Sequence, residues 1–405
     1  MDSRSALLTE SVAPPRVEET KIPREIFLAS AAHFTNDLYN GFLGPLLPML
    51  VARLDLNLAL AGSLVSVLSL FNSVAQVPAG LIADRLRRNY FIVFAPLMTG
   101  FFMSLIGLVN SYGMLVLILA LSGLGTALFH PQAAALVGRL TRSRRGLSMS
   151  VFNVGGSMGI ALGPLLIVPL VSWLGLRASI LAVIPAVIVV LLTFPLLNTA
   201  RAERSDARWA AWKGLSGVWG LVVLLYLMVV IRAAVIILFQ NFIPLSLSHR
   251  GESLFLGATA VTVFQFTGGF GILLGGYLAD RLSKRKVLLW SFLLTPPFAL
   301  TFLVAPQPLA LIALALAALF IFSATPVNII LGQDLLPGNA SFISSIMMGL
   351  AWGVAGLLAT PLGALADWIG LKSMLVALAL LPLAGVLLVM MYPGEGRSPA
   401  AREAV

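Results

Sequence analysis

Long apolar stretches recur along the whole chain, and short polar segments separate them. Each stretch is close to the roughly 20 residues that a helix needs to cross a hydrocarbon core. Helices are expected rather than strands, because an open sheet would leave unpaired backbone groups in lipid. The pattern predicts an all-α membrane protein with about twelve transmembrane helices, at residues 26–50, 60–83, 90–110, 114–137, 146–170, 175–198, 217–245, 255–280, 286–305, 308–331, 342–366 and 371–392.

The polar segments also predict the domain organisation. The first 25 residues lack the order of charged, apolar and small residues that marks a cleaved signal peptide, so a tail is expected there. The charged string NTARAERSDARWAAWKG separates six apolar stretches from six more. We therefore expect an N-terminal cytoplasmic tail at 1–25, a six-helix bundle at 26–198, a cytoplasmic linker at 199–216, a second six-helix bundle at 217–392 and a cytoplasmic C-terminal tail at 393–405.

Composition and charge fit this topology. Hydrophobic residues make up 59% of the chain and charged residues only 10%. Most Lys and Arg side chains lie in alternate loops, and the positive-inside rule then puts both termini in the cytoplasm, most simply in a bacterial cytoplasmic membrane. Topology thus accounts for the net charge of +10, and nucleic-acid binding is not expected. The absence of cysteine excludes disulfides and thiolate chemistry.

A short string after the second stretch, GLIADRLRRNY, has a counterpart in GGYLADRLSKRKV after the eighth. One constant offset aligns both copies, since 276 − 80, 280 − 84 and 281 − 85 are all 196. Two such copies predict a transporter built from parallel repeats. The aligned residues are Gly80, Asp84 and Arg85 in the first copy and Gly276, Asp280 and Arg281 in the second.

These strings resemble the Gly-x-x-x-Asp-Arg motif that the major facilitator superfamily carries between spans two and three. In that family the loop latches the two halves in the outward-open state, so the resemblance implies a role in conformational gating for all six residues. A basic loop that only fixes the orientation in the membrane is the simpler alternative.

The fifth stretch contains VGGSMGIALGPLL, in which Gly155, Gly159 and Gly163 recur every fourth residue and Pro164 follows. This spacing lets two helices approach backbone to backbone. It resembles the span-five motif of drug antiporters in the superfamily, which adds these residues to the gating candidates. Helix packing alone accounts for the same glycines.

A narrower resemblance is to the fosmidomycin resistance protein family of bacterial exporters. It is carried by AAHFTNDLYNG, GLGTALFHPQAAALVGR, GLSMSVFNVGGSMGIALGPLL and QDLLPGNASFISSIMMGLAWGVAG. The chain departs from these families in span four, where Gln132 replaces an acidic residue after His-Pro and Leu119 is nearest to the arginine of many drug antiporters. A proton route is therefore argued from this chain's own residues.

Ionisable side chains are scarce inside the predicted spans. One costs at least ~2.5–3.5 kcal/mol at membrane depth, so it is expected to face a cavity. Asp37 is the acidic residue well inside the first six spans, and Arg232 is the basic residue well inside span seven. Spans one and seven face each other across the cavity in the superfamily, so a pairing of Asp37 with Arg232, direct or through water, is expected.

Polar side chains also share helix faces. His33 and Asp37 are four residues apart on span one, as are Asn36 and Asn40. Amides around a cavity give adjustable hydrogen bonding, although many such groups only join helices. The substrate-binding candidates are Asn36, Asn40, Asn72, Gln76, Gln132, Arg232, Gln240, Asn241, Gln265 and Asn328.

These residues favour proton coupling. Asp37 is expected to bind a proton from outside and release it inside, with His33 and His130 sharing or relaying it, since histidine changes charge near neutrality. Arg232 would neutralise Asp37 or hold an anionic group such as a phosphonate or carboxylate. The alternatives are a structural bridge between Asp37 and Arg232, and a His130 that only bonds a carbonyl freed by Pro131.

The sequence therefore favours a proton-coupled antiporter that exports small amphipathic or anionic compounds, including antibiotics. A symporter or facilitator that imports an organic acid or sugar is the first alternative, and a non-transporting receptor or lipid-handling protein is the second. No nucleophile and base set, phosphate loop or metal-ligand cluster is recognised, so an enzyme is not expected. The expected partners are a small-molecule substrate, protons and the bilayer, with no cofactor or metal and a monomer as the default.

Overall fold

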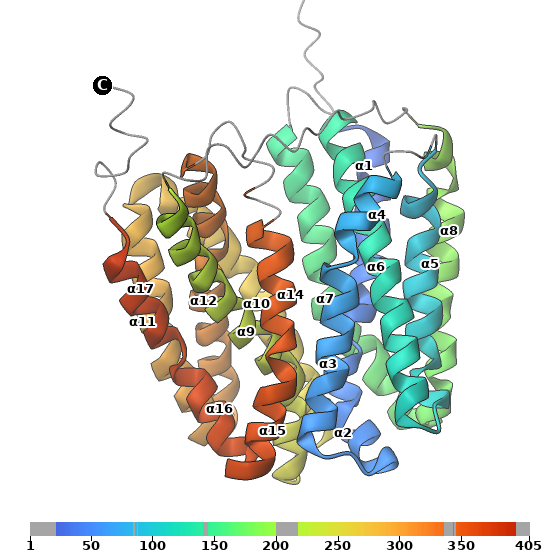
Figure 1. Ribbon diagram of the computed structural model, residues 1–405. Helices are drawn as coiled ribbons and strands as arrows, with labels where there is room; N and C mark the ends of the chain where they lie inside the picture. The colour runs from blue at the N-terminus through green and yellow to red at the C-terminus, as the bar shows by residue number, and fades with distance from the viewer. Residues whose placement is uncertain are drawn as a thin grey trace, which may run out of the picture.

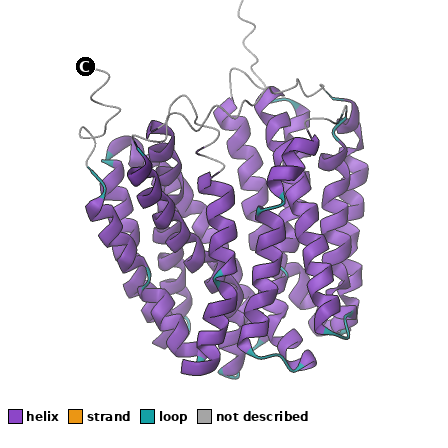
Figure 2. Cartoon of the chain, viewed as in Figure 1, coloured by secondary structure: helices purple, strands orange, loops and turns teal. Residues whose placement is uncertain are grey.

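The computed structural model describes residues 22–83, 86, 88–140, 145–199, 218–335, 343 and 346–393. Within these ranges the chain forms helices joined by short loops (Figure 2). The predicted all-α class is confirmed. The tails and the linker of the predicted domain organisation lie largely outside the described residues.

The first half contains eight labelled α-helices and three short 3₁₀ segments within the described ranges. The α-helices are α1 (Arg24–Asn40), α2 (Leu43–Leu54), α3 (Leu58–Ser73), α4 (Gln76–Ala83), α5 (Tyr90–Ser104), α6 (Tyr112–Leu140), α7 (Arg145–Leu174) and α8 (Ile184–Thr193). The 3₁₀ segments are Leu105–Leu108, Leu176–Val183 and Phe194–Asn198.

The second half repeats this pattern with longer first helices. Its α-helices are α9 (Trp219–His249), α10 (Leu254–Arg281), α11 (Lys284–Val304), α12 (Leu309–Leu335), α14 (Ala351–Leu357), α15 (Ala359–Ile369), α16 (Leu371–Leu380) and α17 (Pro382–Met391). A π-helical turn, Ile346–Leu350, leads into α14.

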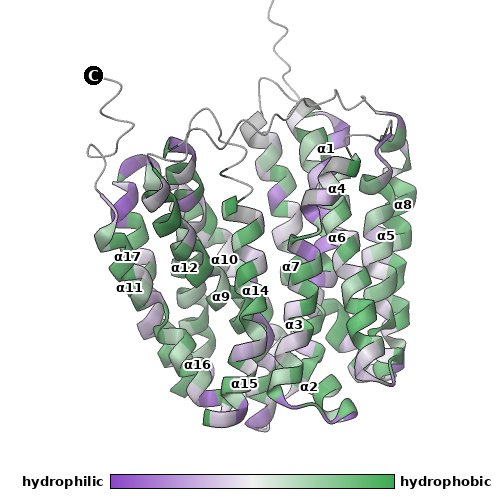
Figure 3. Ribbon diagram, viewed as in Figure 1, coloured by the Kyte–Doolittle hydropathy of each residue, from purple (hydrophilic) through white to green (hydrophobic). Residues whose placement is uncertain are grey.

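The helices form two bundles that stand side by side, α1 to α8 in one and α9 to α17 in the other (Figure 1). The start of α1 and the end of α17 lie at the same end of the molecule, and α2 and α15 lie at the opposite end. Apolar residues cover much of the outer helix surfaces (Figure 3), and large side chains such as Leu191 and Trp290 are 71% and 62% exposed. Such a surface fits lipid rather than water.

In the part of the chain that the structure describes, eleven helices are long and apolar enough to cross a membrane. The first predicted span, 26–50, is not one continuous helix, because it divides into α1 of 17 residues and α2 of 12 residues. The break follows Asn40. Pro45 has no N–H to donate to the carbonyl of Gly41, so the helix is interrupted one turn before the proline.

The same cause divides two other predicted spans. The gap between α3 and α4 includes Val74, four residues before Pro78, and the gap between α14 and α15 follows Leu357, four residues before Pro361. Each proline both removes one helical hydrogen bond and crowds the carbonyl four residues earlier. Each of the three breaks lies about one turn before a proline, whereas other prolines, such as Pro131 and Pro244, lie inside continuous helices.

Hydrogen bonds join the two bundles near the end that carries α2 and α15. The Asp367 carboxylate accepts from the backbone N–H groups of Leu58 and Ala59, both at 2.8 Å, and so caps the start of α3 from α15. Two turns further along α3, Ser66 Oγ donates to the Gly356 carbonyl at 3.0 Å, and Thr360 Oγ1 donates to Ser66 Oγ at 2.8 Å. The bundles are therefore closed against each other at this end.

Candidate functional site

Three titratable side chains meet inside the first bundle. His33 and Asp37 lie one turn apart on α1, and His130 reaches them from α6. Asp37 Oδ2 lies 3.2 Å from His33 Nε2, and Asp37 Oδ1 lies 3.3 Å from His130 Nε2. His33 and Asp37 are buried, whereas 26% of the His130 side chain is exposed. The structure thus brings together the three residues that the sequence suggests for proton coupling.

The His33 ring is held from α7. Its Nδ1 atom lies 2.8 Å from the backbone carbonyl of Phe152, and the two rings stack with their centroids 4.1 Å apart. A carbonyl oxygen only accepts hydrogen bonds, so Nδ1 must carry a proton and donate it. The other ring nitrogen, Nε2, is left for Asp37.

This arrangement fixes a proton count for the His33 and Asp37 pair. With Nδ1 already protonated, a hydrogen bond between Nε2 and Asp37 Oδ2 requires one further proton. The pair is either an imidazolium beside a carboxylate or a neutral imidazole beside a carboxylic acid. Without that proton, two lone pairs would face each other at 3.2 Å, which is repulsive.

The His130 ring is oriented by Gln76, which lies on α4. Gln76 Nε2 lies 3.4 Å from His130 Nδ1, and the amide nitrogen can only donate. Nδ1 then accepts, so Nε2 carries the proton that it donates to Asp37 Oδ1. Neutral His130 therefore satisfies the carboxylate without using the proton that the first pair requires.

Two amides complete the shell around Asp37. Asn36 Nδ2 and Asn40 Nδ2 donate to Asp37 Oδ1 at 3.0 and 3.3 Å. Asn36 Oδ1 in turn accepts from Thr99 Oγ1 on α5 at 2.9 Å. Both amides were substrate-binding candidates, and their contacts hold the acidic group in place.

Gly156 on α7 leaves the space that the His33 and Asp37 pair occupies. A Cβ atom at this position would lie 2.4 Å from His33 Nε2 and 2.8 Å from Asp37 Oδ2. A side chain at this position would therefore force the His33 and Asp37 side chains to move.

The predicted glycine stripe packs α7 against α1 within the same bundle. Cβ atoms at Gly155, Gly159 and Gly163 would lie 2.2 to 2.6 Å from backbone carbonyl oxygens of α1. Pro164 follows the stripe and packs near Gly41, at the break after α1. Close helix packing accounts for these positions, and their gating role stays a prediction.

Arg232 lies in the second bundle with different partners from those expected. Its Nη1 donates to Thr325 Oγ1 on α12 at 2.6 Å, and its guanidinium carbon lies 5.8 Å from the ring centroid of Trp352. No ion pair joins Asp37 to Arg232 among the residues that the structure describes. The histidines and amides compensate Asp37 instead.

Other predicted amides connect the bundles. Gln240 Nε2 on α9 lies 3.5 Å from the Asn40 carbonyl at the end of α1, and Gln265 Nε2 on α10 donates to Gln240 Oε1. A polar path therefore runs from Asp37 through Asn40 to the second bundle. Asn241 points elsewhere, because its Nδ2 donates to the Ile237 carbonyl of its own helix.

Four further candidates either bond to nearby backbone groups or have side-chain atoms without a partner among the described residues. Gln132 Oε1 accepts from the backbone N–H groups of Phe91 and Ile92 and so caps α5. Gln76 Nε2 donates to the Asn72 carbonyl at 2.8 Å, and Asn72 Oδ1 is buried with no hydrogen-bond partner that the described residues supply. Asn328 is fully buried, and neither its Nδ2 nor its Oδ1 has a hydrogen-bond partner in the described part of the chain.

The repeated motif has equivalent surroundings in both bundles where it is described. Gly80 faces Pro131 of α6 at 3.6 Å, and Gly276 faces Pro326 of α12 at 4.0 Å, both measured from the Cβ position. Asp84 and Arg85 lie outside the described residues. Asp280 and Arg281 end α10, where the Arg281 guanidinium lies 4.5 Å from the ring centroid of Tyr277. The gating role of the motif stays a prediction.

Sequence reasoning missed several contributors. Thr99 and Trp352 carry no charge and lie in apolar spans, so nothing in the local pattern separates them from lipid-facing neighbours. Asp367 offered a signal, because it is an acidic residue near the end of a span. Its partners, Leu58 and Ala59, are more than 300 positions away, so only the fold reveals the contact.

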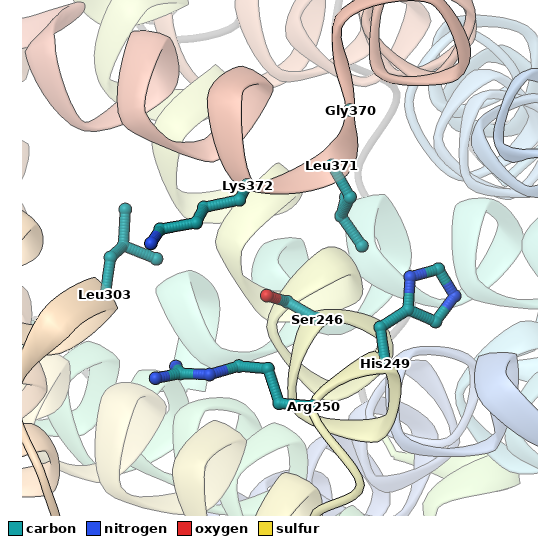
Figure 4. A pocket seen from close by; sticks show the side chains of 7 residues that line it. All are labelled: Ser246, His249, Arg250, Leu303, Gly370, Leu371 and Lys372. Atoms are coloured by element: carbon teal, nitrogen blue, oxygen red, sulfur yellow. The ribbon is translucent and has the colours of Figure 1, made fainter.

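A separate hollow of about 380 Å³ lies at the end of the second bundle that carries the α15–α16 turn. Its lining includes His249, Arg250 and Lys372, whose side chains surround Ser246 (Figure 4). It is formed at the ends of helices, whereas the His33 and Asp37 pair lies inside the first bundle. It is therefore distinct from the buried cluster.

Two helical bundles with a polar interior and an apolar outside define a multi-pass membrane transporter. The Major Facilitator Superfamily model matches residues 29–360, and the chain belongs to that superfamily. It is therefore a secondary transporter and not an enzyme. The repeat of the Gly-x-x-x-Asp-Arg strings and the resemblance seen in the sequence agree with this assignment.

Individual relatives are more distant. The chain is 28% identical over 376 residues to an uncharacterized transporter of the superfamily, YfnC of Bacillus subtilis, covering 89% of this chain and 91% of the relative. It is 24% identical over 375 residues to the fosmidomycin resistance protein of Escherichia coli, with the same coverage. A solved bacterial homologue of the human lysosomal transporter Spinster, in an inward-facing and occupied conformation, has a TM-score of 0.78 at 14% identity, covering 91% of this chain and 96% of that one. This last likeness shows the fold.

Proposed function

We propose that the protein is a proton-coupled antiporter that exports small amphipathic or anionic compounds from the bacterial cytoplasm by alternating access. The observation that carries the proposal is the proton count of the His33 and Asp37 pair. One exchangeable proton decides whether their 3.2 Å contact is attractive or repulsive. A buried pair of this kind is a two-state element that a proton gradient can bias.

The polar path from the His33 and Asp37 pair to the second bundle supports coupling between proton binding and movement of the bundles. Asn40 Nδ2 donates to Asp37 Oδ1, while the Asn40 carbonyl faces Gln240 of α9. Asn40 is also the last residue of α1, beside the break that Pro45 causes. When the proton leaves, Asp37 shifts from His33, and Asn40 passes this shift to the interface between the bundles.

The orientation predicted from the basic loops completes the cycle. It places the end with α2 and α15 outside, so the contacts of Asp367 and Ser66 close the outer side. Breaking them would open the site to external protons. Export, rather than import, is supported by the similarity to the fosmidomycin resistance protein.

Flux in sealed proteoliposomes tests this function. With labelled fosmidomycin outside, an antiporter accumulates the compound when the interior is acidic, because protons leaving the vesicle drive uptake. A symporter accumulates it when the exterior is acidic, and a facilitator only equilibrates it. Accumulation driven by an acidic exterior, or no movement under either gradient, would contradict the proposal.

A further inference from the structure

The second bundle contains a buried cation, Arg232, that has no acidic partner in the part of the chain that the structure describes. Only 2% of Arg232 is exposed, and it lies near the middle of α9. Its Nη1 donates to the Thr325 hydroxyl, while its Nε is buried and has no hydrogen-bond partner among the described residues. The ion pairs of the described residues join Asp37 to the two histidines and Asp334 to Lys284, so none of them involves Arg232.

A buried charge of this kind is costly unless something compensates it. One neutral hydroxyl and an aromatic ring at 5.8 Å are weak compensation for a guanidinium. Structural arginines in apolar surroundings are normally paired with carboxylates in two-point geometry. Among the described residues no carboxylate supplies this compensation, which leaves Arg232 able to accept an anion as a partner.

A second unpartnered group among the described residues lies on α12, the helix whose Thr325 accepts from Arg232. Asn328 is fully buried, and within the described ranges both its Nδ2 and its Oδ1 lack hydrogen-bond partners. It is three residues from Thr325 on α12, so the two side chains lie on the same face of that helix. Donors from Arg232 on α9 and from Asn328 on α12 are thus both available in one region.

Trp352 supplies the apolar part of this region. It is half-buried on α14, just after the π-helical turn Ile346–Leu350, and its ring lies over the Arg232 guanidinium. π-helical turns inside helices often mark functional positions. An indole next to a charged donor suits a ligand whose acidic group is attached to a flat apolar body.

We propose that Arg232, together with Thr325 and Asn328, binds the acidic group of the cargo, and that the cargo class is small organic monoanions, carboxylates or phosphonates, with an apolar body beside Trp352. This inference rests on the proposed transport function and specifies its substrate. It also separates the roles of the two bundles, because the first holds the proton and the second holds the anion.

Binding to the full chain in lipid nanodiscs tests the site. Benzoate and phenylphosphonate are the acidic probes, and benzamide is the neutral match for benzoate. We expect saturable binding of at least one acid, detected by calorimetry and by a rise in Tm, with benzamide at least tenfold weaker. Arg232→Gln is expected to weaken acid binding at least tenfold, and Arg232→Lys, which keeps the charge but loses the planar fork, is expected to be intermediate.

The Tm of the ligand-free protein shows whether the Arg232→Gln variant is folded. Because Arg232→Gln removes an uncompensated buried charge, it should raise the Tm of the ligand-free protein while abolishing the shift caused by the acids. Arg177→Gln changes an exposed arginine in the segment before α8 and should leave both values as in the native chain.

The proposal is wrong if neither acid binds in the millimolar range, if benzamide binds as tightly as benzoate, or if Arg232→Gln binds the acids within twofold of the native chain. A lowered Tm for the ligand-free Arg232→Gln protein would instead assign Arg232 a structural role. The assay requires no pH gradient and no transport. Failure of proton coupling would therefore leave its result unchanged.

Discussion

His33 Nε2 and Asp37 Oδ2 face each other at 3.2 Å across one turn of α1, and the other nitrogen of His33 is committed to the Phe152 carbonyl. This commitment distinguishes the pair from an ordinary buried ion pair. A histidine with a free ring nitrogen can change tautomer when it loses a proton, and the contact would survive. Here the tautomer is fixed, so the loss of one proton turns the contact from attractive to repulsive.

Gly156→Ala tests the geometry of the pair without removing a titratable group. The added methyl would meet His33 Nε2 at 2.4 Å and Asp37 Oδ2 at 2.8 Å, so the pair must separate. We expect gradient-driven flux in proteoliposomes to fall about tenfold or more, which corresponds to ~1.4 kcal/mol. Gly113→Ala is the matched control, because no atom lies within 4 Å of its Cβ position. Equal flux in both variants would show that the spacing of the pair is unimportant.

Asp367→Ala should loosen the closed end. It removes two hydrogen bonds that join the second bundle to the start of α3, each at 2.8 Å. Exposed contacts of this kind are worth about 1 kcal/mol in total, so the population open at this end should rise about fivefold.

Spin labels can measure that population, since the chain has no native cysteine. Cysteines at the exposed positions Ala52 on α2 and Lys372 on α16 report the distance across this end. Asp367→Asn, which keeps one acceptor oxygen, should give a smaller change. An unchanged distance distribution in Asp367→Ala would show that the contact does not hold the bundles together.

Asp334→Asn is expected to have little effect. Asp334 pairs with Lys284 at 3.0 Å, but its side chain is 56% exposed. Ion pairs in such positions contribute roughly 0 to 1 kcal/mol. Thermal unfolding in detergent should therefore shift by only a few degrees, and flux should stay near the native value. Loss of transport at unchanged stability would give this pair a role in the cycle that its geometry does not suggest.

Much of the fold could be predicted from the sequence, because hydrophobic length and loop charge are local signals. The shared face of His33 and Asp37 likewise follows from the four-residue spacing on a helix. The interruption of the first span could not be seen from mean hydropathy, since Gly41 and Pro45 lie in an apolar window. Proline position was the available signal, and it marks the breaks before Pro78 and Pro361 as well.

The contacts between helices were less predictable. His130 was recognised by residue type, but its distance to Asp37 depends on how α6 packs against α1. The expected pairing of Asp37 with Arg232 rested on charge scarcity and on the facing of spans one and seven in the superfamily, and neither reveals that the histidines lie within 3.3 Å of the carboxylate. Asp367 joins the two bundles by accepting hydrogen bonds from backbone N–H groups of α3. The pattern of side chains in the sequence does not indicate such a contact.

The most direct test of the central claim compares gradient-driven fosmidomycin accumulation in proteoliposomes for the native chain, Asp37→Asn and His33→Gln. His249→Gln is the matched control, since it changes an exposed histidine at the end of α9, away from the pair. The account predicts that both variants of the pair lose accumulation driven by an acidic interior but keep exchange of labelled for unlabelled compound, while His249→Gln behaves as the native chain does. Accumulation at the native level in Asp37→Asn would contradict the claim that this pair carries the coupled proton.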